Sequence, residues 1–360
     1  MWRSRGGSGW RLSGLEARCR LAPRLQSVRG GRTGPDGIAS ARWTRRSQAD
    51  TQVLTHQIGV RRSSRRRGLQ PPSAARGTQV RNPLESSGHW RASLRAGDGW
   101  RAVREPRGPY ATASMLEWGS ITKGPVGATA WLTLEVERPV AHYLPAIPDS
   151  EMTVADLVHH TSGLPRLPAV MRDRLFGDPY RKAAGVPLDL AAAVPATPRG
   201  QFVYSNLGYA LLGAVLDEVH GDWFTAVRQH VLEPAGISSA TLEPLPADRV
   251  VAKLFGRTIQ PWALGESSFA AAGGVWSTFD DLCRYADWAL EPGAGPSRTV
   301  SWQREGASIW INGEVRAAGA VIANAVGVTA TVHALAKAPH AADAIATALI
   351  EREVRETCNG

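Results

Sequence analysis

The stretch LEWGSITK at residues 116–123 places Ser120 three positions before Lys123. We expect a helix from about Ser120 to Val136, on which residues three apart share one face, about one turn apart. A serine hydroxyl is a weak nucleophile until a neighbour takes its proton, and a desolvated lysine can do so. Pro125 would fall inside this helix and could distort the turn that presents Lys123. Ser-x-x-Lys is short and weakly specific, so the pair is a candidate nucleophile and base.

A second polar motif, Tyr204-Ser205-Asn206, comes just before residues 206–220, whose apolar residues have helical spacing. A phenol beside an ammonium group can have a lowered pKa and move protons, and a carboxamide can hold a substrate amide. Tyr204 alone is more simply a half-buried core tyrosine. With Ser-x-x-Lys upstream, it becomes a second catalytic candidate.

From Met115 onward the apolar residues follow helix and strand periods. Thr153 and Asp156 have the spacing of a capping box, so a helix should begin at Thr153. The other expected elements are helices at residues 280–290 and 341–356, and strands at residues 308–310, 318–322 and 326–332. Helices in the middle of the chain and strands near its end predict an α+β fold.

Five segments carry a family resemblance: LEWGSITK (116–123), TVADLVHHTSGLP (153–165), GQFVYSNLGYALLGAVLDEVHG (200–221), LEPAGI (232–237) and AAGGVWSTFDDLCRYADWAL (271–290). In this order they resemble the serine β-lactamase and penicillin-binding protein family over residues 115–350. The nearest branch is class C-like, with its D-aminopeptidases, D-alanyl-D-alanine carboxypeptidases and esterases. The resemblance implies an antiparallel sheet flanked by helices, with a mainly helical second part.

The resemblance also implies roles for four side chains. In that family the motif serine is acylated, and its lysine and the later tyrosine manage the proton. The residue at the asparagine position contacts substrate. Carried onto this chain, the catalytic residues are Ser120, Lys123 and Tyr204, and Asn206 is a substrate contact.

The segment Trp-Ile-Asn-Gly that ends at Gly313 is similar to the family's third motif, Lys-Thr-Gly or His-x-Gly, on the strand that lines the oxyanion hole. Ile311 stands where the resemblance implies a basic residue, and losing one such contact raises the barrier by about 3 kcal/mol. Backbone donors need no side chain. We therefore expect the N–H of Glu314, with that of the serine, to hold the oxyanion, and Asn312 and Gly313 to line the substrate site.

Residues 1–110 differ from the rest of the chain in charge. They hold 23 arginines, no lysine and six acidic residues, a net charge of +17, whereas residues 111–360 carry −7. High net charge without apolar periodicity predicts disorder. An arginine-rich arm could bind an anionic surface or nucleic acid, or serve as a transit peptide, but a solvated tail is the simplest interpretation.

Two parts are therefore expected: a disordered segment at residues 1–110 and a β-lactamase-related hydrolase domain at residues 111–360. The resemblance implies two sheet strands before the nucleophile. Residues 1–110 contain no convincing equivalent, so the sheet is expected to lack its N-terminal strands and to expose an edge.

The motifs predict a serine hydrolase that forms an acyl-enzyme on an amide, ester or β-lactam carbonyl of a small-molecule or peptide substrate. The alternative is an impaired or truncated member of the same family, retained for ligand binding or without a role. The serine-hydrolase hypothesis implies no cofactor, and no metal cage is expected because the three cysteines have no CxxC spacing.

The remaining expectations concern partners and location. A specific nucleic-acid partner is not expected, since the positive charge is confined to the first third of the chain. No run of about 18 apolar residues could cross a membrane. The basic start lacks the apolar stretch of a secretory signal, which favours a cytoplasmic location.

Overall fold

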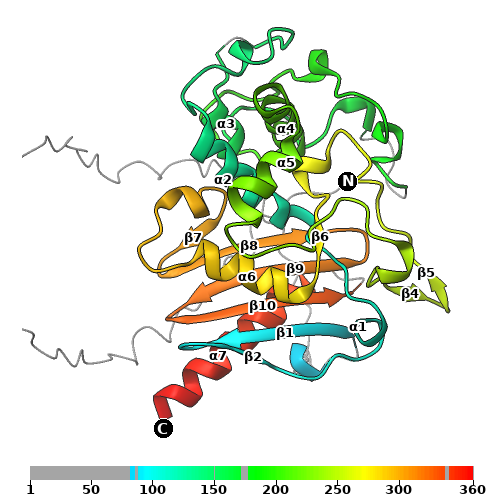
Figure 1. The fold of residues 1–360 in the computed structure, drawn as a ribbon, viewed down its shortest axis with the longest axis vertical. Helices are drawn as coiled ribbons and strands as arrows, with labels where there is room; N and C mark the ends of the chain where they lie inside the picture. Colours follow the sequence, from blue (N-terminus) through cyan, green and yellow to red (C-terminus); the bar gives the residue numbers. More distant parts are fainter. Residues whose placement is uncertain (1–81, 86–87, 150, 172–176, 337–339, 360) are drawn as a thin grey trace, which may run out of the picture. The chain divides into compact units, whose positions relative to one another are not determined.

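The computed structural model describes residues 82–85, 88–149, 151–171, 177–336 and 340–359, and every structural statement below concerns these residues (Figure 1). The expectation of disorder over residues 1–110 lies mostly outside them, since residues 1–81 are not described. No helix in the described part of the chain is long and apolar enough to cross a bilayer.

A six-stranded antiparallel sheet is the main frame of the structure, in the order β2-β1-β10-β9-β8-β7. Its strands are β1 (His89–Arg95), β2 (Trp100–Ala102), β7 (Gln303–Glu305), β8 (Ser308–Glu314), β9 (Ala318–Ala325) and β10 (Val328–Leu335). β9 and β10 join through Val326 and Gly327, which have φ of 52° and 78°. Two residues at positive φ match the right-handed twist of paired strands and set the register of this hairpin.

The helices are α1 (Pro109–Thr112), α2 (Lys123–Thr133), α3 (Val154–Val158), α4 (Asn206–His220), α5 (Trp223–Val227), α6 (Phe279–Ala289) and α7 (Ala341–Asn359). α6 and α7 cover the sheet, whereas α2 to α5 pack mainly against one another in a helical part beside it. α7 packs Ile345, Leu349 and Val354 on one face, and α6 lies on the opposite face (Figure 1). Two further sheets have two short antiparallel strands each. β3 (Leu116–Glu117) pairs with β6 (Trp276–Ser277), and β4 (Lys253–Leu254) pairs with β5 (Arg257–Thr258).

The expected α+β class with an antiparallel sheet and flanking helices is confirmed. The helix at residues 206–220 has its expected bounds, and the Thr153–Asp156 capping box is formed in both directions. The last three expected strands are present and extend further than predicted, because pairing within the sheet continues past the apolar runs.

The expectation that the N-terminal strands are missing is wrong. β1 pairs with β10 from His89 to Leu335, and β2 pairs with β1, so the sheet uses residues from the segment assigned to the tail. Trp90, Ala92 and Leu94 alternate toward the core beneath α7. The intervening Arg91 forms an ion pair with Asp280 of α6 at 2.8 Å.

The expected helix from Ser120 to Val136 is also corrected. A 3₁₀ turn spans Gly119–Thr122, and α2 begins at Lys123. Pro125 is therefore the third residue of α2. In the first turn of a helix a backbone N–H has no intrahelical partner, so proline is accommodated there.

Glu117, three residues before Ser120, is buried at 8% exposure, and this burial raises its pKa to about 8 even though Arg249 lowers it. Between the ordinary pKa of 4.5 and about 8, the unfolded chain loses this proton while the folded chain keeps it. The free energy of unfolding should therefore fall as pH rises through this window.

We expect Glu117→Gln to remove that pH dependence and to raise the free energy of unfolding at pH 8.5 by on the order of 4 kcal/mol, with little change at pH 4.5. Urea unfolding at both pH values measures the difference. Glu243→Gln at an exposed position is the control, with an expected change below about 0.5 kcal/mol. Equal stability of Glu117→Gln and wild type at pH 8.5 would contradict the prediction.

Candidate active site

Ser120 lies in the 3₁₀ turn that joins β3 to α2, facing strand β8. The turn is held by Trp118, whose buried indole Nε1 donates to Ser277 Oγ at 2.8 Å. Gly119 has φ of 52°, in the left-handed region that favours glycine. The local backbone therefore fixes the serine at the start of a helix.

The structure brings three of the predicted residues together. Ser120 Oγ lies 2.5 Å from Tyr204 Oη, although 84 positions separate them in the chain. Lys123 Nζ donates to Ser120 Oγ at 3.3 Å and also to the carbonyl oxygen of Ala272. The hydroxyl of Ser120 thus has two groups within hydrogen-bond distance that could accept its proton.

Burial and charge shift both of these groups. Burial at 3% exposure lowers the pKa of Lys123, and the charge of Arg166 lowers it further, while Tyr204 raises it. Burial raises the pKa of Tyr204, but the charge and hydrogen bond of Lys123, the bond to Ser120 and the charge of Arg166 lower it overall. The pKa values of Lys123 and Tyr204 therefore both lie below their ordinary values, which makes the deprotonated form of each more accessible.

His160 packs against this pair as part of the scaffold. Its ring centre lies 4.7 Å from that of Tyr204, and its Nδ1 accepts the backbone N–H of Ser205 at 3.2 Å. Burial lowers the pKa of His160 to about 3, so the imidazole is neutral at pH 7. It therefore positions the tyrosine ring without adding charge.

Strand β8 forms the other side of the site. A Cβ built on Gly313 would lie 2.6 Å from Ser120 N, and one built on Gly119 would lie 3.1 Å from Glu314 N. The backbone nitrogens of Ser120 and Glu314 therefore both lie where strand β8 approaches the turn that carries Ser120. Ile311 lines the cavity beside Ser120 at 4% exposure, as its place in the strand predicts.

Two predicted substrate contacts are occupied by other partners. Asn206 does not line the cavity, and its Nδ2 donates to Tyr180 Oη at 2.8 Å. Its buried Oδ1 has no hydrogen-bond partner among the described residues. Asn312 lines the cavity, but its Nδ2 donates to both carboxylate oxygens of Asp343 at 3.2 Å.

The residues meet in a cavity of about 880 Å³. The lining side chains that the sequence did not single out include Arg166, Phe202, Trp302 and Arg304. Two of them had a signal nearby, because Arg166 directly follows the segment HHTSGLP and Phe202 comes two residues before Tyr204. The other two lie after α6, close to strand β8, and carry no local motif.

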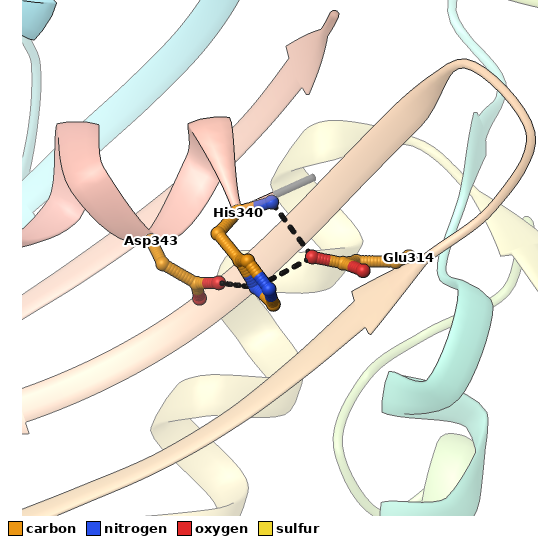
Figure 2. Close-up of side chains that lie close together, drawn as sticks. All are labelled: Glu314, His340 and Asp343. Atoms are coloured by element: carbon orange, nitrogen blue, oxygen red, sulfur yellow. Dashed lines mark hydrogen bonds and ion pairs between the residues drawn. The ribbon is translucent and has the colours of Figure 1, made fainter. Parts of the chain in front are cut away.

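One group among the described side chains could hold a cation: Glu314, His340 and Asp343, whose ligand atoms lie within 4.8 Å of one another. Figure 2 shows His340 between the two carboxylates. Its backbone N–H and Nδ1 each lie 2.7 Å from Glu314 Oε1, and Nδ1 lies 3.2 Å from Asp343 Oδ2. The three side chains therefore lie close together because they bind one another. These contacts connect the end of β8 to the start of α7.

The profile of the Beta-lactamase family matches residues 86–321, well over half of the chain. The chain belongs to the beta-lactamase family. This confirms the predicted family, which is one of serine hydrolases. The match also begins before β1, in agreement with the two N-terminal strands found in the sheet.

Among curated relatives, the D-alanyl-D-alanine-carboxypeptidase/endopeptidase AmpH of Escherichia coli (strain K12) is 29% identical over 164 residues, 42% of each chain. The chain thus matches less than half the length of this relative. A class C beta-lactamase from Rhodobacter sphaeroides superposes with a TM-score of 0.55 at 18% identity, covering 74% of this chain and 94% of that one.

A second solved structure, a beta-lactamase/D-alanine carboxypeptidase from Yersinia pestis, gives a TM-score of 0.57 at 18% identity and covers 75% of this chain and 95% of that one. At this identity the superpositions establish the fold. They agree with the beta-lactamase family assignment and with the predicted beta-lactamase/transpeptidase-like architecture.

Proposed function

We propose that this beta-lactamase family member is a hydrolase that forms an acyl-enzyme at Ser120. The observation that carries the proposal is the hydroxyl of Ser120, within 2.5 Å of Tyr204 Oη and 3.3 Å of Lys123 Nζ at the wall of a cavity. A nucleophile with a base in hydrogen-bond reach, and a second group to orient that base, is the arrangement that acyl transfer needs.

In the first step Ser120 Oγ attacks the carbonyl carbon and gives its proton to the pair formed by Lys123 and Tyr204. The backbone N–H groups of Ser120 and Glu314 stabilise the negative charge on the carbonyl oxygen. The bond to the leaving group then breaks, and Tyr204 returns the proton to it. Water, activated by the same pair, releases the acyl group in a second step.

The substrate would be an amide, ester or β-lactam. β7 pairs with β8 only as far as Trp310, so residues 311–314 of β8 pair with β9 alone and leave one backbone edge toward the cavity. An extended acyl substrate could add to that edge by backbone hydrogen bonds. The backbone of Gly313 and Glu314 would form these hydrogen bonds with the substrate. The Oδ1 of Asn206, which has no partner among the described residues, is a further candidate contact.

The second candidate is an impaired family member that binds a ligand without turning it over. Ile311 favours it, because this buried apolar side chain gives no electrostatic help to the site. The two candidates differ in whether a covalent adduct forms at Ser120.

Labelling with a fluorophosphonate probe and with a fluorescent penicillin, followed by peptide mass mapping, tests the proposal. We expect an adduct on the peptide that contains Ser120. Ser301→Ala is the matched control, since Ser301 lines the same cavity but is bound to Tyr209 Oη at 2.7 Å, and it should label as wild type does. Absence of any adduct, or an adduct on Ser301, would favour the second candidate.

A further inference from the structure

We propose that the β4–β5 hairpin holds this protein on the surface of an anionic phospholipid bilayer, with Phe255 at its tip inserted among the lipid headgroups. The contact is peripheral, and it does not depend on the chemistry at Ser120. Three features of the hairpin carry the inference: the exposure of its tip, a turn geometry that disfavours phenylalanine, and the basic residues around it.

The hairpin projects from the body on an anchored stem. β4 and β5 are paired antiparallel, and the pairing continues into the stem, where the N–H of Ile259 donates to the carbonyl oxygen of Ala252 at 2.9 Å. Just before the stem, Val250 is buried in a core cluster with Leu116. Residues 253–258 are by contrast all exposed, and Figure 1 shows the hairpin at the edge of the body. The fold therefore holds this tip out into solvent.

Phe255 occupies a position that the turn geometry makes unfavourable for it. Leu254 pairs with Arg257, so Phe255 and Gly256 form a two-residue loop, with φ of 49° and 77°. Positive φ at both positions is typical of a type I′ turn, which prefers asparagine, aspartate or glycine at the first of them. A bulky side chain there is an outlier. Because the ring of Phe255 is 96% exposed, packing within the chain does not offset this cost.

The charge around the tip fits an anionic surface. Residues 249–265 contain three basic residues and no acidic one. Two of the basic residues, Lys253 and Arg257, are exposed and form no ion pair with another described residue. Arg316 is also exposed, and it lines a small pocket together with Gln260 of the stem. An apolar tip is thus flanked by cations that are free to meet lipid phosphates.

A bilayer interface suits this combination better than another protein does. The ring of Phe255 and the side chain of Leu254 would enter the boundary between headgroups and acyl chains, while Lys253 and Arg257 stay with the phosphates. A stable contact with a second copy of the chain buries about 800 Å² on each partner, which the tip of so short a hairpin does not supply.

Co-sedimentation with vesicles tests the inference, using phosphatidylcholine alone and an equal mixture with phosphatidylglycerol. We expect wild type to bind the mixed vesicles and Phe255→Asn to bind them about 5- to 20-fold more weakly. Asparagine before glycine is favoured in this turn, so the variant should fold and its melting temperature should not fall. Phe255→Trp keeps an aromatic side chain of the interfacial type and should bind within about 3-fold of wild type.

The two cations of the hairpin are tested in the same assay. Lys253→Gln combined with Arg257→Gln should weaken binding by about 10-fold or more at low salt, and wild-type binding should fall as salt rises. Arg352→Gln combined with Arg355→Gln is the matched control, because it removes the same charge from α7. This control should stay within about 3-fold of wild type. Equal losses in both double variants would overturn the inference, because net charge alone would then explain binding.

A second control addresses the apolar part of the contact. Val170→Asn removes another exposed apolar side chain, 80% exposed and outside the hairpin, and it should bind the mixed vesicles within about 3-fold of wild type. A loss equal to that of Phe255→Asn would overturn the inference, because the tip would then have no special role.

Hydrogen–deuterium exchange locates the contact, which is necessary because the arginines of residues 1–81 could bind anionic vesicles by themselves. With mixed vesicles, exchange in the peptide spanning residues 250–260 should slow in wild type and not in Phe255→Asn. Unchanged exchange in that peptide of wild type, or wild-type binding by Phe255→Asn, would overturn the inference. Sedimentation velocity without lipid tests the other occupant: self-association that Phe255→Asn abolishes would assign the tip to a second copy and would also overturn it.

Discussion

We expect Ser120→Ala to lower kcat for hydrolysis of 4-nitrophenyl esters by roughly 10³- to 10⁶-fold. In the proposed mechanism the attacking group is this hydroxyl, within 2.5 Å of Tyr204 and 3.3 Å of Lys123, and alanine leaves nothing to acylate. An activated ester is the appropriate substrate, because its leaving group needs little protonation. A stopped assay with excess enzyme measures the residual rate.

Lys123→Ala should lose nearly as much, since the unassisted hydroxyl is a poor nucleophile. The double variant should be no worse than Ser120→Ala, because both residues act in one step. Ser301→Ala, at a second serine of the cavity, should keep activity within about 3-fold. Additive losses, or hydrolysis that survives Ser120→Ala, would show that the reaction takes place elsewhere.

Gly313→Ala is expected to reduce kcat by about 10²- to 10³-fold, the effect of losing one oxyanion donor. The added Cβ would lie 2.1 Å from the carbonyl oxygen of Trp118 and 2.6 Å from Ser120 N. Both are backbone atoms and cannot rotate away, so β8 must move from the turn that carries Ser120. The backbone N–H of Glu314 would then lose its place beside that of the serine.

Gly319→Ala on β9 is the control for this change. Gly319 is paired with Glu314 in the sheet, but the nearest atom to its new Cβ would be 3.6 Å away, an ordinary contact. We expect this variant to keep activity within about 3-fold. The rate of fluorophosphonate labelling per folded molecule, with thermal unfolding in parallel, distinguishes a displaced strand from an unfolded protein. Wild-type labelling of Gly313→Ala would refute the assignment of β8 to the oxyanion site.

Several features were predictable from the sequence because they depend on neighbours a few residues apart. The capping box of Thr153 and Asp156 and the bounds of α4 follow from contacts at spacings of three and four residues. The spacing of Ser120 and Lys123 likewise placed both within one turn, even though that turn is 3₁₀ before it becomes α-helical.

The N-terminal strands were not predictable from composition. In β1 the core residues Trp90, Ala92 and Leu94 alternate with Arg91, Ser93 and Arg95, a period of two within a segment that is arginine-rich throughout. What decides this strand is its pairing with β10, more than 200 positions later. This pairing depends on the partner strand and on acidic residues of α6 that neutralise the arginines of β1. Both lie far away in the sequence, so the residues next to β1 could not predict the pairing.

The sequence by itself determined the kinds of side chain available for the chemistry, the helices that present them and the family they resemble. The tertiary structure alone decided which of them meet. It brought Tyr204 to Ser120, left Asn206 bonded to Tyr180, and placed Arg166 beside the tyrosine ring. The physical reason is that helix signals act over one or two turns, whereas a cavity is set by the packing of distant segments against one sheet.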